Sequence, residues 1–150
     1  MLKLYLKVYI KCIKRIFILI LLKLLIVIGL KSEDYSYLLK GPLAGSLYYT
    51  AEKPGRWKEL IESHTPIITK NKNKIEVITN HEMRGVEHYI IKHIVFDKEF
   101  KIISEVKFKP SISIPSSSHN ISGYSGEVFV LSICNQHDNW LNFISLDKIN

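Results

Sequence analysis

A series of short segments in which apolar and polar residues alternate most limits what this chain can fold into. Each segment is rich in Ile, Val, Phe or Tyr, which is typical of β-strands. Residues 71–73 and 97–99 have the composition of hairpin turns, and the Ser-, Pro- and Gly-rich residues 110–126 are expected to form a loop. Several short antiparallel strands joined in this way predict an all-β fold, a β-sandwich. The segments are residues 74–79, 87–97, 101–109, 127–134 and 141–146.

The N-terminal part has a different composition. Residues 16–30 form an apolar run after a basic stretch, which is typical of an export signal or signal anchor. Lys23 interrupts the run, which is also shorter than the roughly 20 residues of a stable membrane span. We therefore expect a hydrophobic leader helix over residues 1–31, a linker over 32–49 and one domain over 50–150. The protein would be exported, either periplasmic or anchored at the extracytoplasmic face of a membrane if the leader stays uncleaved.

The leader also accounts for the formal net charge of +7. Its seven basic residues are accompanied by no Asp or Glu, so 21 less 7 leaves 14 Lys and Arg in the rest of the chain, equal to its 14 Asp and Glu. A neutral domain lacks the basic face that binding to nucleic acid requires, and we expect no such partner. The seven are Lys3, Lys7, Lys11, Lys14, Arg15, Lys23 and Lys31.

Four histidines and one cysteine lie in motifs that suit a transition metal. Imidazole binds iron, copper, nickel or zinc, and one soft thiolate added to several imidazoles favours a redox-capable metal. The other cysteine, Cys12, lies in the leader and would stay on the opposite side of the membrane from Cys134. Because His137 follows Cys134 by three residues, a metal ligand is a better explanation for this lone thiol than a free cysteine. The motifs are Glu62-Ser63-His64-Thr65-Pro66, His81-Glu82-Met83, Glu87-His88-Tyr89-Ile90 and Cys134-Asn135-Gln136-His137-Asp138-Asn139-Trp140.

In this order the motifs resemble those of the superoxide reductases, the neelaredoxin and desulfoferrodoxin family, over roughly residues 50–145. The resemblance implies an immunoglobulin-like β-sandwich in which loops at one end hold a mononuclear non-haem iron. It also implies the one-electron reduction of superoxide to hydrogen peroxide, an external electron donor such as a rubredoxin-like protein, and a chain able to form a homo-oligomer. The implied metal ligands are His64, His81, His88 and His137 around the iron, with Cys134 axial.

Two residues before His64 are implied to act in catalysis. Glu62 matches the family glutamate that occupies the sixth position in the oxidised state, although a surface carboxylate is the alternative interpretation. Ser63 stands where the family usually has a lysine, so the attraction for superoxide is expected to be weaker. The resemblance also implies that backbone amides near Asn135 and Gln136 donate hydrogen bonds to the thiolate. Asp138 replaces the family glycine.

Two further histidines match no motif. His93 and His88 lie an odd number of residues apart in one predicted strand, so they would face opposite sides and His93 would be a surface or core residue. His119 is expected to be solvated in a flexible loop. Two other functions stay open: an exported iron-binding or electron-transfer module of the same fold without significant superoxide turnover, and an immunoglobulin-like module without a metal.

Overall fold

The computed structural model describes residues 11, 13–20, 34–112 and 114–147. The chain divides into two compact units, Met1–Asp34 and Tyr35–Asn150. In the first unit, residues 11 and 13–20 are helical and their side chains are exposed. The rest of the predicted leader, Cys12 included, lies outside the described residues. Within the described ranges, no helix is both long enough and apolar enough to cross a membrane.

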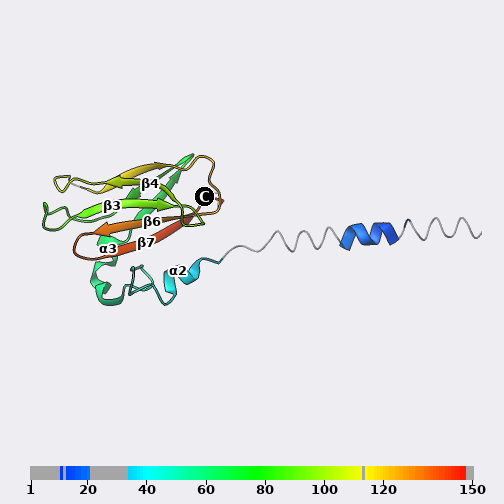
Figure 1. The fold of residues 1–150 in the computed structure, drawn as a ribbon, viewed down its shortest axis with the longest axis horizontal. Helices are drawn as coiled ribbons and strands as arrows, with labels where there is room; N and C mark the ends of the chain where they lie inside the picture. The colour runs from blue at the N-terminus through cyan, green and yellow to red at the C-terminus, as the bar shows by residue number, and fades with distance from the viewer. Residues whose placement is uncertain (1–10, 12, 21–33, 113, 148–150) are drawn as a thin grey trace, which may run out of the picture. The chain divides into compact units, whose positions relative to one another are not determined.

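The second unit consists mainly of two antiparallel sheets, which confirms the predicted all-β class. One sheet has the order β1-β2-β5 and the other the order β4-β3-β6-β7, whose strands run side by side in Figure 1. Three short helical elements precede the strands: α2 (Ser36–Lys40), η1 (Gly55–Leu60) and α3 (Ile61–His64). The strands are β1 (Ile67–Asn71), β2 (Lys74–Ile78), β3 (Ile90–Phe96), β4 (Ile102–Lys107), β5 (Ser116–Asn120), β6 (Glu127–Cys134) and β7 (Asn139–Ser145).

The main hydrophobic core joins the two sheets. Ile75 and Val77 of β2 lie in one cluster with Val95 of β3 and with Val128 and Val130 of β6, all of them buried. Alternate residues of each strand supply this cluster, as the period of two in the sequence predicts. The two sheets therefore pack face to face around the alternating apolar residues.

A second cluster covers the outer face of the larger sheet. Phe129, which points away from the main core, is fully buried with Tyr35, Leu38 and Leu141. The Tyr35 and Phe129 rings meet edge to face, with centroids 5.2 Å apart. Tyr49 extends the sheet beside β7, because its amide donates to the Asn139 carbonyl at 2.8 Å. Much of the segment 32–49, expected as a linker, thus packs on the domain, and the compact unit begins at Tyr35.

Strand β5 lies inside residues 110–126, which were expected to form a loop. Its sequence, Ser-Ser-Ser-His-Asn, contains no apolar residue, so an alternating apolar pattern does not detect it. The strand is nevertheless half-buried, with Ser117 and His119 directed inward. The prediction that His119 is solvated is therefore wrong: only 2% of its surface is exposed.

Candidate metal centre

The five residues of the motifs meet at one end of the domain. Their donor atoms all lie within 4.8 Å of one another. His64 is the last residue of α3, His81 and His88 lie in the connection from β2 to β3, and Cys134 is the last residue of β6. His137 lies in the turn between β6 and β7. One helix end, one strand end and two connections thus bring the five side chains together from separate parts of the sequence.

The four imidazole rings form a closed ring of neighbours. Consecutive rings are nearly perpendicular, at 85° for His64 and His81, 80° for His81 and His88, 86° for His88 and His137, and 78° for His137 and His64. His64 and His88, which lie across this ring, are 26° from parallel with centroids 6.2 Å apart. The geometry also identifies the inward nitrogens: Nε2 of His64, His81 and His88, and Nδ1 of His137.

The distances between these nitrogens fit a single bound metal ion. They are 3.0 Å between His64 and His137, 3.0 Å between His81 and His88, and 2.9 Å between His88 and His137. Two nitrogens that each bind a metal at about 2.1 Å, at right angles to one another, are separated by about 3.0 Å. The sulfur of Cys134 lies 3.7 Å from His81 Nε2 and 3.8 Å from His137 Nδ1. Four nitrogens and one sulfur therefore surround a common point.

Burial keeps the imidazoles neutral. His64 and His81 are buried, and burial, assisted by the neighbouring imidazoles, lowers the pKa of His64 to about 3 and that of His81 to about 4. Burial also lowers the pKa of the half-buried His88 and His137. A neutral imidazole offers a lone pair to a metal, whereas a protonated one does not. The four side chains are thus ready to bind a metal at neutral pH.

The Cys134 thiol is 4% exposed, and burial raises its pKa. Backbone amides of Gln136 and His137 act in the opposite direction, and the Gln136 N–H donates to Sγ at 3.4 Å. The expected amide donor is therefore present at Gln136. The amide of Asn135 instead donates to the Tyr89 carbonyl at 3.2 Å. The Asn135 side chain also links the β6–β7 turn to the β2–β3 connection, because it donates to the Glu87 carbonyl at 3.0 Å.

Ser63 contacts the proposed ligand next to it. Its hydroxyl donates to the Leu60 carbonyl at 3.2 Å and lies 2.8 Å from His64 Nδ1. A hydroxyl that donates to the carbonyl accepts from an Nδ1–H, which leaves the lone pair of His64 on Nε2. Glu62 is exposed and lines a surface pocket with Thr65 and Asn80. The structure thus places Ser63 against His64, whereas Glu62 lies at the protein surface.

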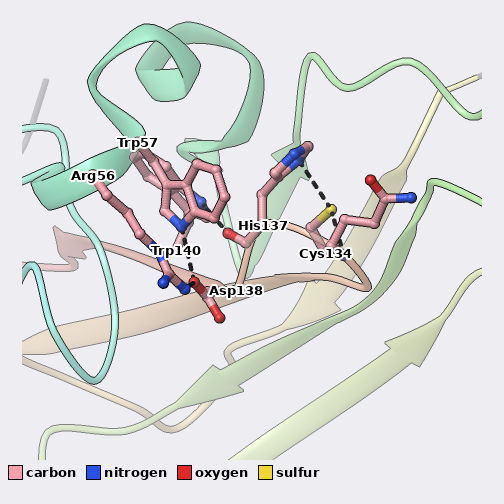
Figure 2. Close-up of polar contacts among 7 residues, drawn as sticks. Arg56, Trp57, Cys134, His137, Asp138 and Trp140 are labelled. Atoms are coloured by element: carbon pink, nitrogen blue, oxygen red, sulfur yellow. Dashed lines mark hydrogen bonds and ion pairs between the residues drawn. The ribbon is translucent and has the colours of Figure 1, made fainter.

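Two residues absent from the sequence motifs lie beside His137. Figure 2 shows Arg56 and Trp57 of η1 approaching the turn that carries His137 and Asp138. The Asp138 carboxylate accepts hydrogen bonds from both residues, and the Trp57 ring meets the His137 ring edge to face at 4.9 Å. The indole of Trp140 donates to the His137 carbonyl at 2.9 Å. The sequence contains a lone Trp57 before the first motif, but nothing in the pattern pairs it with Asp138.

His93 and His119 lie outside this cluster, as their lack of a motif predicts. Both are buried between the sheets, where His93 Nδ1 lies 2.7 Å from the Ser117 hydroxyl. His88 and His93 do not share a strand as predicted, since β3 begins at Ile90 and His88 lies in the connection before it. His93 is directed into the core and away from the five donors because of its position in β3.

Superoxide reductases are among the solved structures that share this fold. The superoxide reductase (neelaredoxin) from Ignicoccus hospitalis is 21% identical, with a TM-score of 0.55 over 67% of this chain and 94% of that chain. Two variants of that protein have TM-scores of 0.59 at 21% identity and 0.57 at 22% identity, with the same coverage. No model of a known protein family and no curated protein matches this sequence. The chain thus shares the all-β fold of solved members of the family that its motifs resemble.

Proposed function

We propose that this chain binds one iron ion and reduces superoxide to hydrogen peroxide, taking up one electron and two protons for each superoxide. The convergence of four imidazole nitrogens and one thiol carries this proposal. Structural zinc is almost always held by four ligands, whereas five donors that include one thiolate suit a redox-active ion. The proposed ligands are His64, His81, His88, Cys134 and His137.

The protein contributes the binding site and its electrostatic setting. The neutral imidazoles donate their lone pairs, while the amides of Gln136 and His137 stabilise a thiolate at Cys134. Iron held there would supply one-electron redox chemistry. We propose that the electron comes from an external donor such as a rubredoxin-like protein, and that the apolar N-terminal segment exports the domain.

A second candidate function is an iron-binding or electron-transfer module without significant superoxide turnover. The position of Ser63 favours it, because this hydroxyl is occupied by Leu60 and His64 and supplies no positive charge. The exposed arginines near the cluster are each paired with a carboxylate, Arg56 with Asp138 and Arg84 with Glu82. A paired charge attracts an anion less than a free one does.

Metal analysis tests the iron site. After anaerobic expression in iron-rich medium, the chain should contain one iron and should show a visible thiolate-to-iron absorption band when oxidised. Cys134→Ser should lose the band because it removes the sulfur, whereas His119→Gln, altered in the core, should keep it. Protein that contains only zinc, or a band that persists in Cys134→Ser, would contradict the proposal. Reaction rates with pulsed superoxide then separate a reductase from a carrier.

A further inference from the structure

We propose that Arg56, Trp57 and Asp138 form a positioning clamp that assembles the metal centre from two distant segments. This inference rests on the proposed metal site and adds three residues to it. One segment is η1 with α3, which ends at His64. The other is the turn from Cys134 to Asp138, which contains two of the proposed ligands. The clamp joins these segments outside the ring of imidazoles.

The clamp is centred on one carboxylate oxygen. Asp138 Oδ2 accepts a hydrogen bond from Arg56 Nη2 at 2.7 Å and another from Trp57 Nε1 at 2.8 Å. The Arg56 guanidinium also lies 4.8 Å from the centroid of the Trp57 ring, within reach of a cation–π interaction. Hydrogen bonds to a charged acceptor are about twice as strong as neutral ones. Figure 2 shows the three side chains converging beside His137.

Asp138 transmits this contact to the ligand turn through its backbone. The Asp138 carbonyl accepts a hydrogen bond from the Cys134 amide at 3.0 Å, which closes the turn. The residue has a φ of 63°, a left-handed conformation that asparagine, aspartate and glycine adopt most easily. Its side chain and backbone therefore hold η1 and the Cys134–His137 turn at the same time.

The clamp has a direct consequence for metal binding. The Trp57 ring packs against the His137 ring edge to face, and His137 Nδ1 lies 3.0 Å from His64 Nε2. Fixing η1 on the turn therefore fixes the distance between two proposed ligands before a metal arrives. A preorganised site binds more tightly because it loses less conformational freedom on binding. Loosening the clamp should weaken metal binding while leaving all five donors in place.

Titration of the full chain with Co²⁺, followed by its visible absorption, tests this inference. Asp138→Gly removes the carboxylate and accepts the left-handed backbone without steric cost. Trp57→Phe keeps an aromatic ring beside His137 but removes the indole N–H. We expect Asp138→Gly to weaken Co²⁺ binding about tenfold, the lower end of the range for partners of metal ligands. Asp138→Asn should restore most of the affinity, because its amide oxygen can still accept from both Arg56 and Trp57.

The double variant and a matched control separate coupling from a general loss of stability. Trp57→Phe should weaken binding in the natural sequence but have little further effect beside Asp138→Gly, because both changes break the same hydrogen bond. Glu99→Gln breaks another exposed ion pair, with Lys101, at the opposite end of β3, and should leave Co²⁺ binding unchanged. If Asp138→Gly does not fold, Arg56→Gln, which alters an exposed side chain, should still weaken binding.

The outcomes distinguish this inference from the proposed function. Folded variants that bind Co²⁺ within twofold of the natural chain would overturn the clamp and leave the metal site standing. Additive effects in the double variant would also overturn it. A natural chain that binds no Co²⁺ would overturn both the metal site and the clamp.

Discussion

Ser63 lies where the resemblance to superoxide reductases predicts a lysine. Its hydroxyl reaches His64 Nδ1 at 2.8 Å, so its visible role is to fix the orientation and tautomer of a proposed ligand. A hydrogen-bond partner on the outer nitrogen of a ligating histidine typically changes metal affinity 10- to 100-fold. The structure thus gives Ser63 a contact that supports His64.

Removal of this hydroxyl should weaken metal binding. Ser63→Ala leaves His64 Nδ1 without its side-chain partner, and we expect Co²⁺ affinity to fall about tenfold. Ser63→Thr keeps a hydroxyl and should bind nearly as well as the natural chain. Ser46→Ala is the matched control, since the Ser46 hydroxyl also donates to backbone carbonyls but is exposed and far from the motifs in sequence. Equal affinity in Ser63→Ala and Ser46→Ala would show that Ser63 does not support the site.

At the scale of the strands, a buried polar network joins the two sheets. His93 of β3 contacts Thr79 at 2.9 Å and Ser117 of β5 at 2.7 Å, and Ser117 contacts His119 at 2.7 Å. Thr79 in turn contacts Ser132 of β6 at 2.9 Å. Polar groups in a core are tolerated when they are hydrogen-bonded. This network explains how the polar strand β5 can form one face of the sandwich.

The same network should make the fold sensitive to acid. Burial lowers the pKa of His93 to about 3. Burial also lowers the pKa of His119, and the nearby charge of Glu76 raises it in part. Because the unfolded chain takes up these protons near pH 6.5, stability is full above that pH and is lost as the pH falls toward 3. At pH 5, His93 alone should cost about 2 kcal/mol.

Urea unfolding at pH 7.5 and pH 5 measures this loss. His93→Gln cannot be protonated in this range but keeps hydrogen-bonding groups, so it should lose less stability between the two pH values than the natural chain. His119→Gln should show the same direction. An unchanged difference between the two pH values in His93→Gln would mean that His93 does not control the acid response.

At the scale of the whole molecule, the domain includes the segment before residue 50. Tyr35 and Leu38 are buried against Phe129 and Leu141, on the face of the larger sheet that the main core leaves free. Burial of a large apolar side chain contributes about 1.5–3 kcal/mol. Residues 35–49 are therefore expected to stabilise the sandwich.

Two shortened chains test this contribution. A chain of residues 50–150 should be several kcal/mol less stable in urea than one of residues 34–150, because it loses both side chains. In the longer chain Leu38→Ala should cost about 2–5 kcal/mol. Leu47→Ala should have little effect, since Leu47 is 66% exposed. Equal stability of the two shortened chains would contradict the role of this segment.

The sequence by itself determined the fold class and the residues of the candidate metal centre. Alternating apolar residues specify strands such as β2 and β6, since only one face of each segment can enter the main core. The motifs also identified all five donors. A metal site needs particular side chains, and the residues beside each of these match one family pattern in the same order. Strand patterns and motifs each lie within a short segment, so they can be predicted from the sequence of that segment alone.

Only the tertiary structure decided which distant segments touch. Trp57 donates to Asp138, and Tyr35 packs on Phe129, although the partners in each pair are far apart in the sequence. His119 is buried in a strand that contains no apolar residue. The choice of Nδ1 rather than Nε2 at His137 likewise follows from the turn that carries it. Each of these contacts arises because folding brings separate segments to one place, and the residues of one segment carry no local signal of their partner.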